Sequence, residues 1–221
     1  MQVSIVRPES PGEPAELCII IDVLRATTTA AVLCQRLGEL CLLRTPADLD
    51  QLPPGSYALF SELSGIVCEH PRFDNSPVQA RDAEITGTPV LVTTNGTLAV
   101  GIAAQLAPQI VLASFVNLSA IADHVTRTAP SRIAIMPAGN IKSAKRCSED
   151  DACAEALAAR LAGAELDLPA RIAAVRADPR ILRRQAAEPG LPADLDLCFS
   201  VDAVPVVPRV APSGAYFRVT R

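Results

Sequence analysis

Histidine is scarce in this sequence of 221 residues, and no Cys-x-x-Cys pair occurs in it. A structural zinc site needs four closely spaced Cys or His ligands, so the two histidines, His70 and His124, argue against one. The seven cysteines are odd in number, and several lie in apolar runs where a thiol behaves as a small buried group. Together with the lack of a secretory signal peptide, they predict a reducing, cytoplasmic location.

An excess of positive charge is also missing. Twenty basic residues against 24 acidic residues give a net charge of −4 and a pI near 5.2, and the basic residues are scattered. Nucleic-acid binding requires a basic patch or stripe, so no nucleic-acid partner is expected. No apolar run approaches the roughly 20 residues that span a bilayer, so no membrane partner is expected either. The sequence carries no signal for an oligomeric state.

The common phosphate-binding and phosphatase signatures are absent too. No GxxxxGKS/T motif occurs and no GxGxxG motif follows a predicted strand, which argues against a nucleoside triphosphatase and a dinucleotide site. A phosphatase with a DxD nucleophile would need a second acid at Leu24, two residues after Asp22. A cysteine phosphatase would need an arginine six residues after a cysteine, and none of the seven cysteines has one.

The remaining pattern is that of a globular α/β protein, with 49% apolar and 20% charged residues. From residue 16 to about residue 163, short apolar runs rich in β-branched residues alternate with Ala/Leu segments of helical periodicity. Such alternation predicts βα units around a largely parallel sheet. We expect strands at 17–22, 40–44, 57–61, 89–94, 109–114 and 132–137, and helices at 26–37, 46–52, 96–107, 117–128 and 149–163.

Two segments depart from this alternation. Residues 62–88 contain several prolines and glycines and no clear period, which predicts a long excursion over the sheet edge, and such loops are often functional. Residues 164–221 begin as helix and end in short Val-rich runs interrupted by prolines, which predict edge strands or a small C-terminal lobe. We therefore expect a single domain over residues 1–221, with its core at 16–163.

Small polar and charged residues follow five of the predicted strands. Parallel strands point their carboxyl ends to one edge of a sheet, and ligands bind in the crevice there. This edge is therefore the candidate ligand site. The residues expected at it are Asp22, Arg25 and Thr27 to Thr29 after the first strand, Glu62, Thr94 to Thr97, Ser114, Asn117, Gly139 and Asn140.

Two of these groups are suited to an anion. Asn95 and Gly96 form a turn directly before a predicted helix, where glycine permits unusual backbone angles and the helix N-terminus exposes N–H groups. Alternatively, Thr97 or Asn95 only caps the helix. Arg25 offers a planar fork to an anion, or it pairs with a neighbouring carboxylate. The residue types are compatible with both alternatives.

Acidic residues in the same regions are candidate ligands for a hard cation such as magnesium, which takes oxygen ligands. The run Ser148 to Asp151 also fits a helix start, with a serine N-cap and acids in the first turn. Asp22 ends an otherwise apolar strand, and a buried charge without partners is costly, so it is the strongest candidate. The full candidate set is Asp22, Glu62, Asp74, Glu149, Asp150 and Asp151.

Six short motifs follow one another along the chain: DVLRATTT (22–29), FDNSP (73–77), TTNGT (93–97), SFVN (114–117), PAG (137–139) and SEDDACA (148–154). Together they resemble the 2-phosphosulfolactate phosphatase family, well over residues 16–163 and more faintly beyond. The resemblance implies a three-layer α/β/α fold with a mixed, largely parallel sheet. It also implies magnesium-dependent hydrolysis of the phosphate ester of 2-phospho-3-sulfolactate, a step in coenzyme M biosynthesis.

The chain departs from the family pattern in its loops. Ser61-Glu62-Leu63 stands where the family usually has a Gly-Glu-Arg triplet, so the acid is kept and both neighbours differ. The FDNSP motif is shorter than the usual FDLGNSP, and the loop before SEDD is rich in Lys and Arg. These loops would touch the substrate, so the exact phosphate ester stays open. Lys142, Lys145 and Arg146 are candidates for receiving a sulfonate or carboxylate.

The resulting hypothesis is a magnesium-dependent phosphatase of a small anionic phosphate ester, with Asp22, Arg25 and Glu62 as catalytic residues. Asp22 holds Mg²⁺ together with acids from the set Glu62, Asp74, Glu149 and Asp150. Arg25 and the N–H groups at Asn95 to Thr97 hold the phosphoryl oxygens. The predicted phosphate-binding residues are Thr27, Thr28, Thr94, Asn95, Gly96, Thr97, Ser114, Asn117 and Gly139.

Other functions are compatible with the same residues. One is a non-catalytic protein that binds an anion or phosphate ester, and another is a lyase or isomerase that acts on a hydroxy-acid phosphate. Within the phosphatase hypothesis, a metal-activated water attacks directly or Asp22 forms a phospho-enzyme. Both routes fit the sequence.

Overall fold

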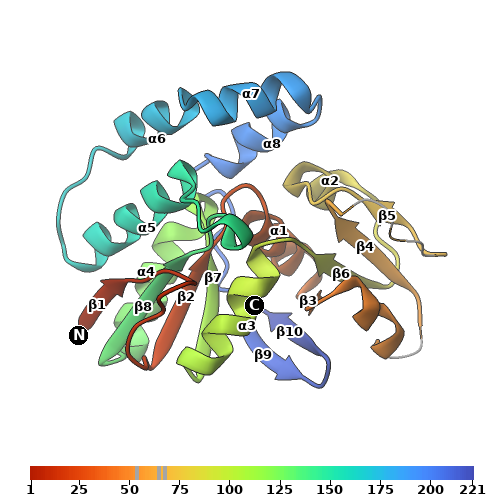
Figure 1. Ribbon diagram of the computed structural model, residues 1–221, viewed down its shortest axis with the longest axis horizontal. Coiled ribbons are helices and arrows are strands. Elements are labelled where there is room, and N and C mark those ends of the chain that lie inside the picture. Colours follow the sequence, from red (N-terminus) through yellow and green to blue (C-terminus); the bar gives the residue numbers. More distant parts are fainter. Residues whose placement is uncertain (53–54, 64–65, 67–68) are drawn as a thin grey trace.

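The computed structural model covers residues 1–221, and the structure is described for residues 1–52, 55–63, 66 and 69–221. Helices lie on both faces of a central sheet (Figure 1), which confirms the three-layer α/β/α architecture. In the described residues, ten strands form the sheet in the order β1-β8-β2-β7-β9-β10-β3-β6-β4-β5. The strands are β1 (Gln2–Ile5), β2 (Leu17–Ile21), β3 (Glu39–Leu43), β4 (Tyr57–Ser61), β5 (Arg72–Phe73), β6 (Thr88–Val92), β7 (Gln109–Ala113), β8 (Arg132–Pro137), β9 (Arg209–Ser213) and β10 (Tyr216–Thr220).

The helices alternate with these strands over most of the chain. They are α1 (Ala26–Leu37), α2 (Pro77–Asp82), α3 (Gly96–Leu106), α4 (Leu118–Thr128), α5 (Ser148–Leu161), α6 (Leu168–Arg176), α7 (Pro179–Ala187) and α8 (Leu191–Cys198), with 3₁₀ turns at Pro46–Gln51, Phe115–Asn117 and Ile141–Ser143. In the described part of the chain, none of these helices has the length and apolar content required to cross a bilayer.

Strand β2 shows why the core forms as it does. All five of its residues are buried, as expected for a parallel strand covered on both faces. Successive side chains point to opposite faces. Cys18 and Ile20 therefore pack in the cluster that includes α1 and α3, while Leu17, Ile19 and Ile21 pack in the cluster that includes α4 and α5. A continuous apolar run thus becomes the centre of both helical layers.

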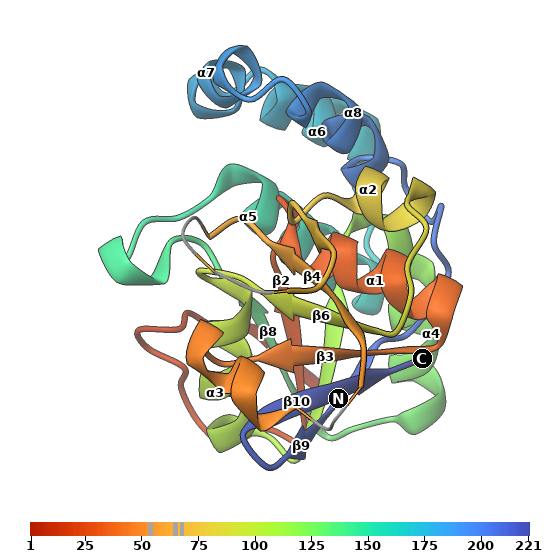
Figure 2. The same ribbon diagram turned by 90° about the vertical axis from the view of Figure 1, so that its right-hand side faces the viewer.

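The sheet consists of two parallel blocks. One contains β1, β8, β2 and β7, and the other contains β3, β6, β4 and β5. Between the blocks, β7 pairs antiparallel with β9, β9 with β10, and β10 with β3. Three successive antiparallel pairings reverse the chain direction, so the second block runs opposite to the first. Figure 2 shows β3 and β6 crossing the direction of β2 and β8, which lets the carboxyl ends of β2 and β4 meet at one cleft.

The expectation of edge strands at the C-terminus was wrong, because β9 and β10 lie in the middle of the sheet. Prolines normally exclude a segment from a central strand. Here the Leu112 N–H donates to the carbonyl oxygen of Pro208 at 2.9 Å, so proline serves as an acceptor. Gly214, with φ of +65°, lies in the two-residue turn between the strands. Phe217 and Val219 are then buried in the core.

The other predicted elements agree with the structure within one or two residues, except that 46–52 forms a 3₁₀ turn rather than an α-helix. Strands β1 and β5 and helix α2 were not predicted. The excursion at 62–88 does reach the sheet edge, where β5 is the last strand, although residues 64–65 and 67–68 lie outside the described residues. Six cysteines are free thiols, and Cys68 lies outside the described residues.

The helices α6, α7 and α8, here called the cap, lie together at one end of the molecule in both views (Figures 1 and 2). The cap packs on the cluster beneath α4 and α5 through Val175, Ile181, Leu191 and Leu195. The chain returns from the cap to β9 in the centre of the sheet, so the C-terminal strands pair directly with strands of the core.

Phe217→Ala is expected to lower the free energy of unfolding by about 3–5 kcal/mol, because it empties a fully buried site between the two blocks. Chemical denaturation followed by circular dichroism measures this change. Leu182→Ala, at a side chain that is 51% exposed, is the control and should shift it by less than about 0.5 kcal/mol. A loss below about 1 kcal/mol for Phe217→Ala would mean that the hairpin is peripheral to stability.

Candidate active site

A cleft of about 570 Å³ lies at the carboxyl ends of β2, β4, β6 and β8, beneath α7 of the cap. Four of the five strand ends at which the sequence places polar residues therefore contribute to one site, whereas Ser114 and Asn117, after β7, do not line it. The cleft is lined by Asp22, Leu24, Arg25, Glu62, Asp74, Thr94, Asn95, Gly139, Asn140, Cys147, Glu149, Asp150, Arg180, Arg184 and Glu188.

Asp22 lies where β2 ends and α1 begins. Its carboxylate Oδ1 accepts a hydrogen bond from the Ala26 N–H at 3.3 Å, and the Thr27 hydroxyl accepts one from the Asp22 N–H at 3.0 Å. Gly96 begins α3 against the same carboxylate: a Cβ atom at Gly96 would lie 2.6 Å from Ala26 Cβ and 3.1 Å from Asp22 Oδ2. Only a glycine permits this approach, so the first turns of α1 and α3 both face Asp22.

The surroundings of Asp22 are short of positive charge. Burial, followed by the negative charge of Glu62 and, less strongly, of Glu149, raises the pKa of the Asp22 carboxyl to about 7. Burial also raises the pKa of Glu149, although Arg180 opposes it. Three carboxyl groups from β2, the loop after β4 and α5 therefore share one electrostatic environment.

Glu62 is fixed by donors on both of its oxygens. Thr94 donates to Oε1 through its N–H at 2.9 Å and its hydroxyl at 2.7 Å, and the Asn75 amide donates to Oε2 at 2.7 Å. In the described part of the chain, the buried amide oxygen of Asn75 has no hydrogen-bond partner. The carboxylate is thus oriented by the loop after β6 and by the shortened FDNSP motif.

Arg25 is 6% exposed and contacts two carboxylates. Its Nη1 donates to Asp194 Oδ2 at 2.6 Å, and its Nη2 lies 3.2 Å from Asp74 Oδ2. Burial alone lowers the pKa of Arg25, but the hydrogen bond to Asp194 and the charge of Asp74 produce a net increase. The guanidinium is therefore permanently charged and held at the cleft wall.

The start of α5 contributes two buried acids with different environments. Glu149 pairs with Arg180 of α7. Asp150 accepts the Val23 N–H at 2.8 Å and the Gly139 N–H at 3.0 Å, one on each carboxylate oxygen. Asp150 thus ties the ends of β2 and β8 together. Burial, then the charges of Glu149 and Asp22, raises the pKa of Asp150 well above its usual value.

Helix α7 supplies cations that sequence reasoning did not assign to the site. Arg180 and Arg184 line the cleft, and Arg184 pairs with Glu188 at 2.9 Å. Among the described residues of the lining, six carboxylates therefore face three guanidiniums. The RILRR run at 180–184 was the available signal, since residues four apart share one face of a helix. Asp194 was also missed, because a lone acid in a helical segment carries no distinctive pattern.

Several predicted phosphate-binding residues lie outside the cleft lining and make internal contacts instead. The Thr28 hydroxyl donates to the Val23 carbonyl oxygen and lies 2.7 Å from Ser114 Oγ. The Asn117 side chain donates to two backbone carbonyls, one of them at 2.9 Å in Val206. The predicted residues that do not line the cleft are Thr27, Thr28, Gly96, Thr97, Ser114 and Asn117, whereas Thr94, Asn95 and Gly139 do.

The three cations that were proposed to receive a sulfonate or carboxylate also lie outside the lining. Lys142, Lys145 and Arg146 are exposed, and Arg146 pairs with Asp151 at 2.6 Å. The described cations of the cleft come from Arg25 and from α7 instead. In the described residues, no three His, Cys, Asp or Glu side chains are grouped closely enough to form a ready-made metal site.

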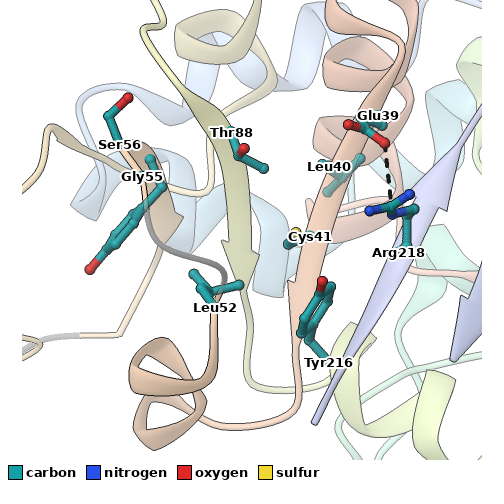
Figure 3. Close-up of a pocket in the computed structure, with 10 residues that line it drawn as sticks. Glu39, Leu40, Cys41, Leu52, Gly55, Ser56, Thr88, Tyr216 and Arg218 are labelled. Carbon is teal, nitrogen blue, oxygen red and sulfur yellow. Dashed lines mark ion pairs between the residues drawn. The ribbon is translucent and has the colours of Figure 1, made fainter. Parts of the chain in front are cut away.

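A much smaller hollow of about 100 Å³ opens between β3, β10 and the segment before β4 (Figure 3). Glu39 and Arg218 lie 3.8 Å apart across one side of it, and the Tyr216 ring faces Leu52 across another. It contains none of the predicted site residues. The cleft at Asp22 is therefore the candidate active site.

Comparison with known proteins gives a consistent family. The sequence profile of the 2-phosphosulpholactate phosphatase family matches residues 5–212. A Deinococcus radiodurans protein named probable 2-phosphosulfolactate phosphatase is 34% identical over 219 residues, covering 89% of this chain and 88% of that protein. Proteins of the same name from Prochlorococcus marinus and Thermoplasma acidophilum are 31% and 28% identical, covering 89% and 88% of this chain and 90% and 86% of their own lengths. The chain belongs to the 2-phosphosulpholactate phosphatase family.

Proposed function

We propose that this chain is a phosphoric monoester hydrolase that acts on the phosphate ester of a small 2-hydroxy acid, with 2-phosphosulfolactate as the first substrate to test. The observation that carries the proposal is the cleft at Asp22, which is lined by six carboxylates, three of them buried, and by three arginines. Such a site suits a cation and a multiply charged anion together. Phosphoryl transfer needs little else, because positioning and charge neutralisation supply most of the catalysis.

The donor set fits a hard divalent cation such as Mg²⁺. Asp22, Glu62 and Glu149 supply carboxylate oxygens, which are the usual ligands of Mg²⁺. Burial first and the charge of Glu62 second raise the pKa of Asp22, and a bound cation would stabilise its charged form. Mg²⁺ keeps several waters and commonly takes only one or two carboxylates, so a preformed group of three acids is not required. When bound, it would neutralise charge on the phosphoryl oxygens.

The other predicted ligands fit less well. Asp150 uses both carboxylate oxygens for backbone N–H groups, so we assign it to holding β2 and β8 rather than to the cation. Asp74 is 45% exposed and lies beside Arg25. We therefore place the cation at Asp22, with Glu62 or Glu149 as the second carboxylate.

The phosphoryl group is held from two sides in this proposal. Arg25 supplies a fixed guanidinium on one side, and the first turn of α3, which begins after Asn95, supplies backbone N–H groups and the positive end of a helix on the other. Water attacks phosphorus, the ester P–O bond breaks, and the departing oxygen takes a proton to give the 2-hydroxy acid and inorganic phosphate. If Asp22 instead attacks first, the same products follow, and trapping a phosphorylated carboxylate during turnover distinguishes the two routes.

Arg180 and Arg184 are placed to receive a second anionic group of the substrate. Both lie on α7, which faces Asp22 across the cleft. Guanidinium groups bind carboxylate and sulfonate oxygens through paired N–H donors. A phosphate ester with such a group would reach from Asp22 to the cap.

Metal removal is the first test. Release of inorganic phosphate from 2-phosphosulfolactate is expected to stop in EDTA and to return when Mg²⁺ is restored, because the carboxylates would otherwise repel the phosphoryl group. A colorimetric phosphate assay measures it. Full activity in EDTA would contradict the metal assignment. No phosphate from any ester, despite tight ester binding, would indicate the binding-protein alternative instead.

Asp22→Asn is expected to lower kcat by about 100-fold or more while the protein stays folded, because the change removes a carboxylate that faces the reacting group. Asp82→Asn, at an exposed acid paired with Arg81 outside the cleft, is the matched control and should keep wild-type activity. Steady-state kinetics with a circular-dichroism check distinguishes the two. Retained activity in Asp22→Asn would rule out Asp22 as a ligand or nucleophile.

Arg184→Gln is expected to raise KM for 2-phosphosulfolactate by about tenfold and to raise KM for 2-phospholactate less. The reason is that 2-phosphosulfolactate carries a sulfonate as well as a carboxylate, whereas 2-phospholactate carries only the carboxylate. The neighbouring Arg183→Gln is the control, since Arg183 is exposed and does not line the cleft. Both substrates are measured for both variants. Equal changes for the two esters would show that Arg184 does not recognise the sulfonate.

A further inference from the structure

We propose that Asp194 is a positioning residue for this reaction: its buried carboxylate fixes the Arg25 guanidinium at the cleft wall. The inference rests on the proposed function, because it depends on Arg25 binding the phosphoryl group. Asp194 lies on α8 of the cap, 169 residues from Arg25 along the chain. The cap would then organise the site through Asp194 as well as through the arginines of α7.

The Asp194 carboxylate is held by donors from two other elements, the starts of α1 and α2. It is 1% exposed, and its Oδ2 accepts from Arg25 at the start of α1. Its Oδ1 accepts from the Ser76 hydroxyl at 2.6 Å and from the Val78 N–H at 3.4 Å, both at the start of α2. With donors on both oxygens, the carboxylate has one defined orientation, and this orientation fixes the position of the Arg25 guanidinium.

Arg25 needs such an anchor because it stands between two hollows. It lines the cleft on one side and a second hollow of about 310 Å³ between α2 and the cap on the other. A long arginine side chain without a fixed partner has space on both sides. Its other partner, Asp74, is 45% exposed and more distant, at 3.2 Å. Asp194 borders the second hollow and is the firmer of the two anchors.

A buried ion pair is weak evidence for a role in stability, because desolvation offsets much of the attraction between the charges. Its geometry is better suited to fixing one arrangement of the guanidinium. Loss of the Asp194 charge should therefore act through Arg25. The amide in Asp194→Asn keeps the shape and one oxygen but no longer offers a carboxylate to the guanidinium.

The test uses four full-length proteins: wild type, Asp194→Asn, Arg25→Lys and the double variant. For each, kcat and KM for 2-phosphosulfolactate and the Kd of inorganic phosphate are measured at a temperature where the protein is fully folded. Asp194→Asn is expected to lower kcat/KM about 10- to 100-fold, with a higher KM and at least about tenfold weaker phosphate binding. In the Arg25→Lys background it should change kcat/KM by less than about threefold, because the two residues act as a unit.

Asp196→Asn is the control on the same helix, since this side chain is 77% exposed, and its kinetics should match wild type. The inference is overturned if Asp194→Asn matches wild type, if it loses kcat with KM and phosphate binding unchanged, or if its loss is as large in the Arg25→Lys background. Should Asp194→Asn not fold, Asp194→Glu moves the same charge by one methylene, and a raised KM supports the inference whereas an unchanged KM overturns it. A wild type that neither binds phosphate nor releases it would instead refute the proposed function.

Discussion

Buried negative charge at the end of β2 is the constraint on which the site depends. Asp22, Glu149 and Asp150 are 8%, 2% and 3% exposed, and carboxylates at such positions are costly unless donors or cations compensate them. The chain compensates part of this charge with backbone N–H groups and with Arg180. Burial, and after it the negative charge of Glu62, keeps the pKa of Asp22 high, and we infer that the cation and the substrate bind beside this carboxylate.

The sheet topology brings these charges together. An ordinary parallel sheet would collect them because all strand ends share one edge, but here the two blocks run in opposite directions. The β9–β10 hairpin separates them, and the second block crosses the first (Figure 2), so the end of β4 with Glu62 approaches the end of β2 with Asp22. Several strand-end residues named from the sequence therefore line one cleft, although the premise of a single shared edge did not hold. No local pattern specifies how C-terminal strands pair across the sheet.

A candidate site residue can be predicted from sequence where a charged side chain stands at a position expected to be buried. Asp22, a charge that ends an apolar strand, does line the cleft, whereas Thr28, Ser114 and Asn117 follow strands in the same way yet form hydrogen bonds inside the fold. A hydroxyl or amide can form a hydrogen bond with a buried backbone group as readily as with a ligand, so its position alone does not distinguish the two roles. Asp194 was not identifiable, because its role exists only once the cap folds against Arg25.

The shortened FDNSP motif illustrates how an altered loop can keep a site intact. Its three consecutive polar residues contact three different members of the site: Asp74 contacts Arg25, Asn75 donates to Glu62, and Ser76 donates to Asp194. The loop thus links the acid of the altered Ser61-Glu62-Leu63 triplet to the cation of α1 and to the cap. Leu63 replaces the arginine that ends the family's usual triplet, and the described cations of the cleft come from Arg25 and α7. The altered loops thus keep a hydrogen bond to Glu62 and an ion pair to Arg25, the acid and the arginine of the proposed site, which favours a changed substrate preference over a lost reaction.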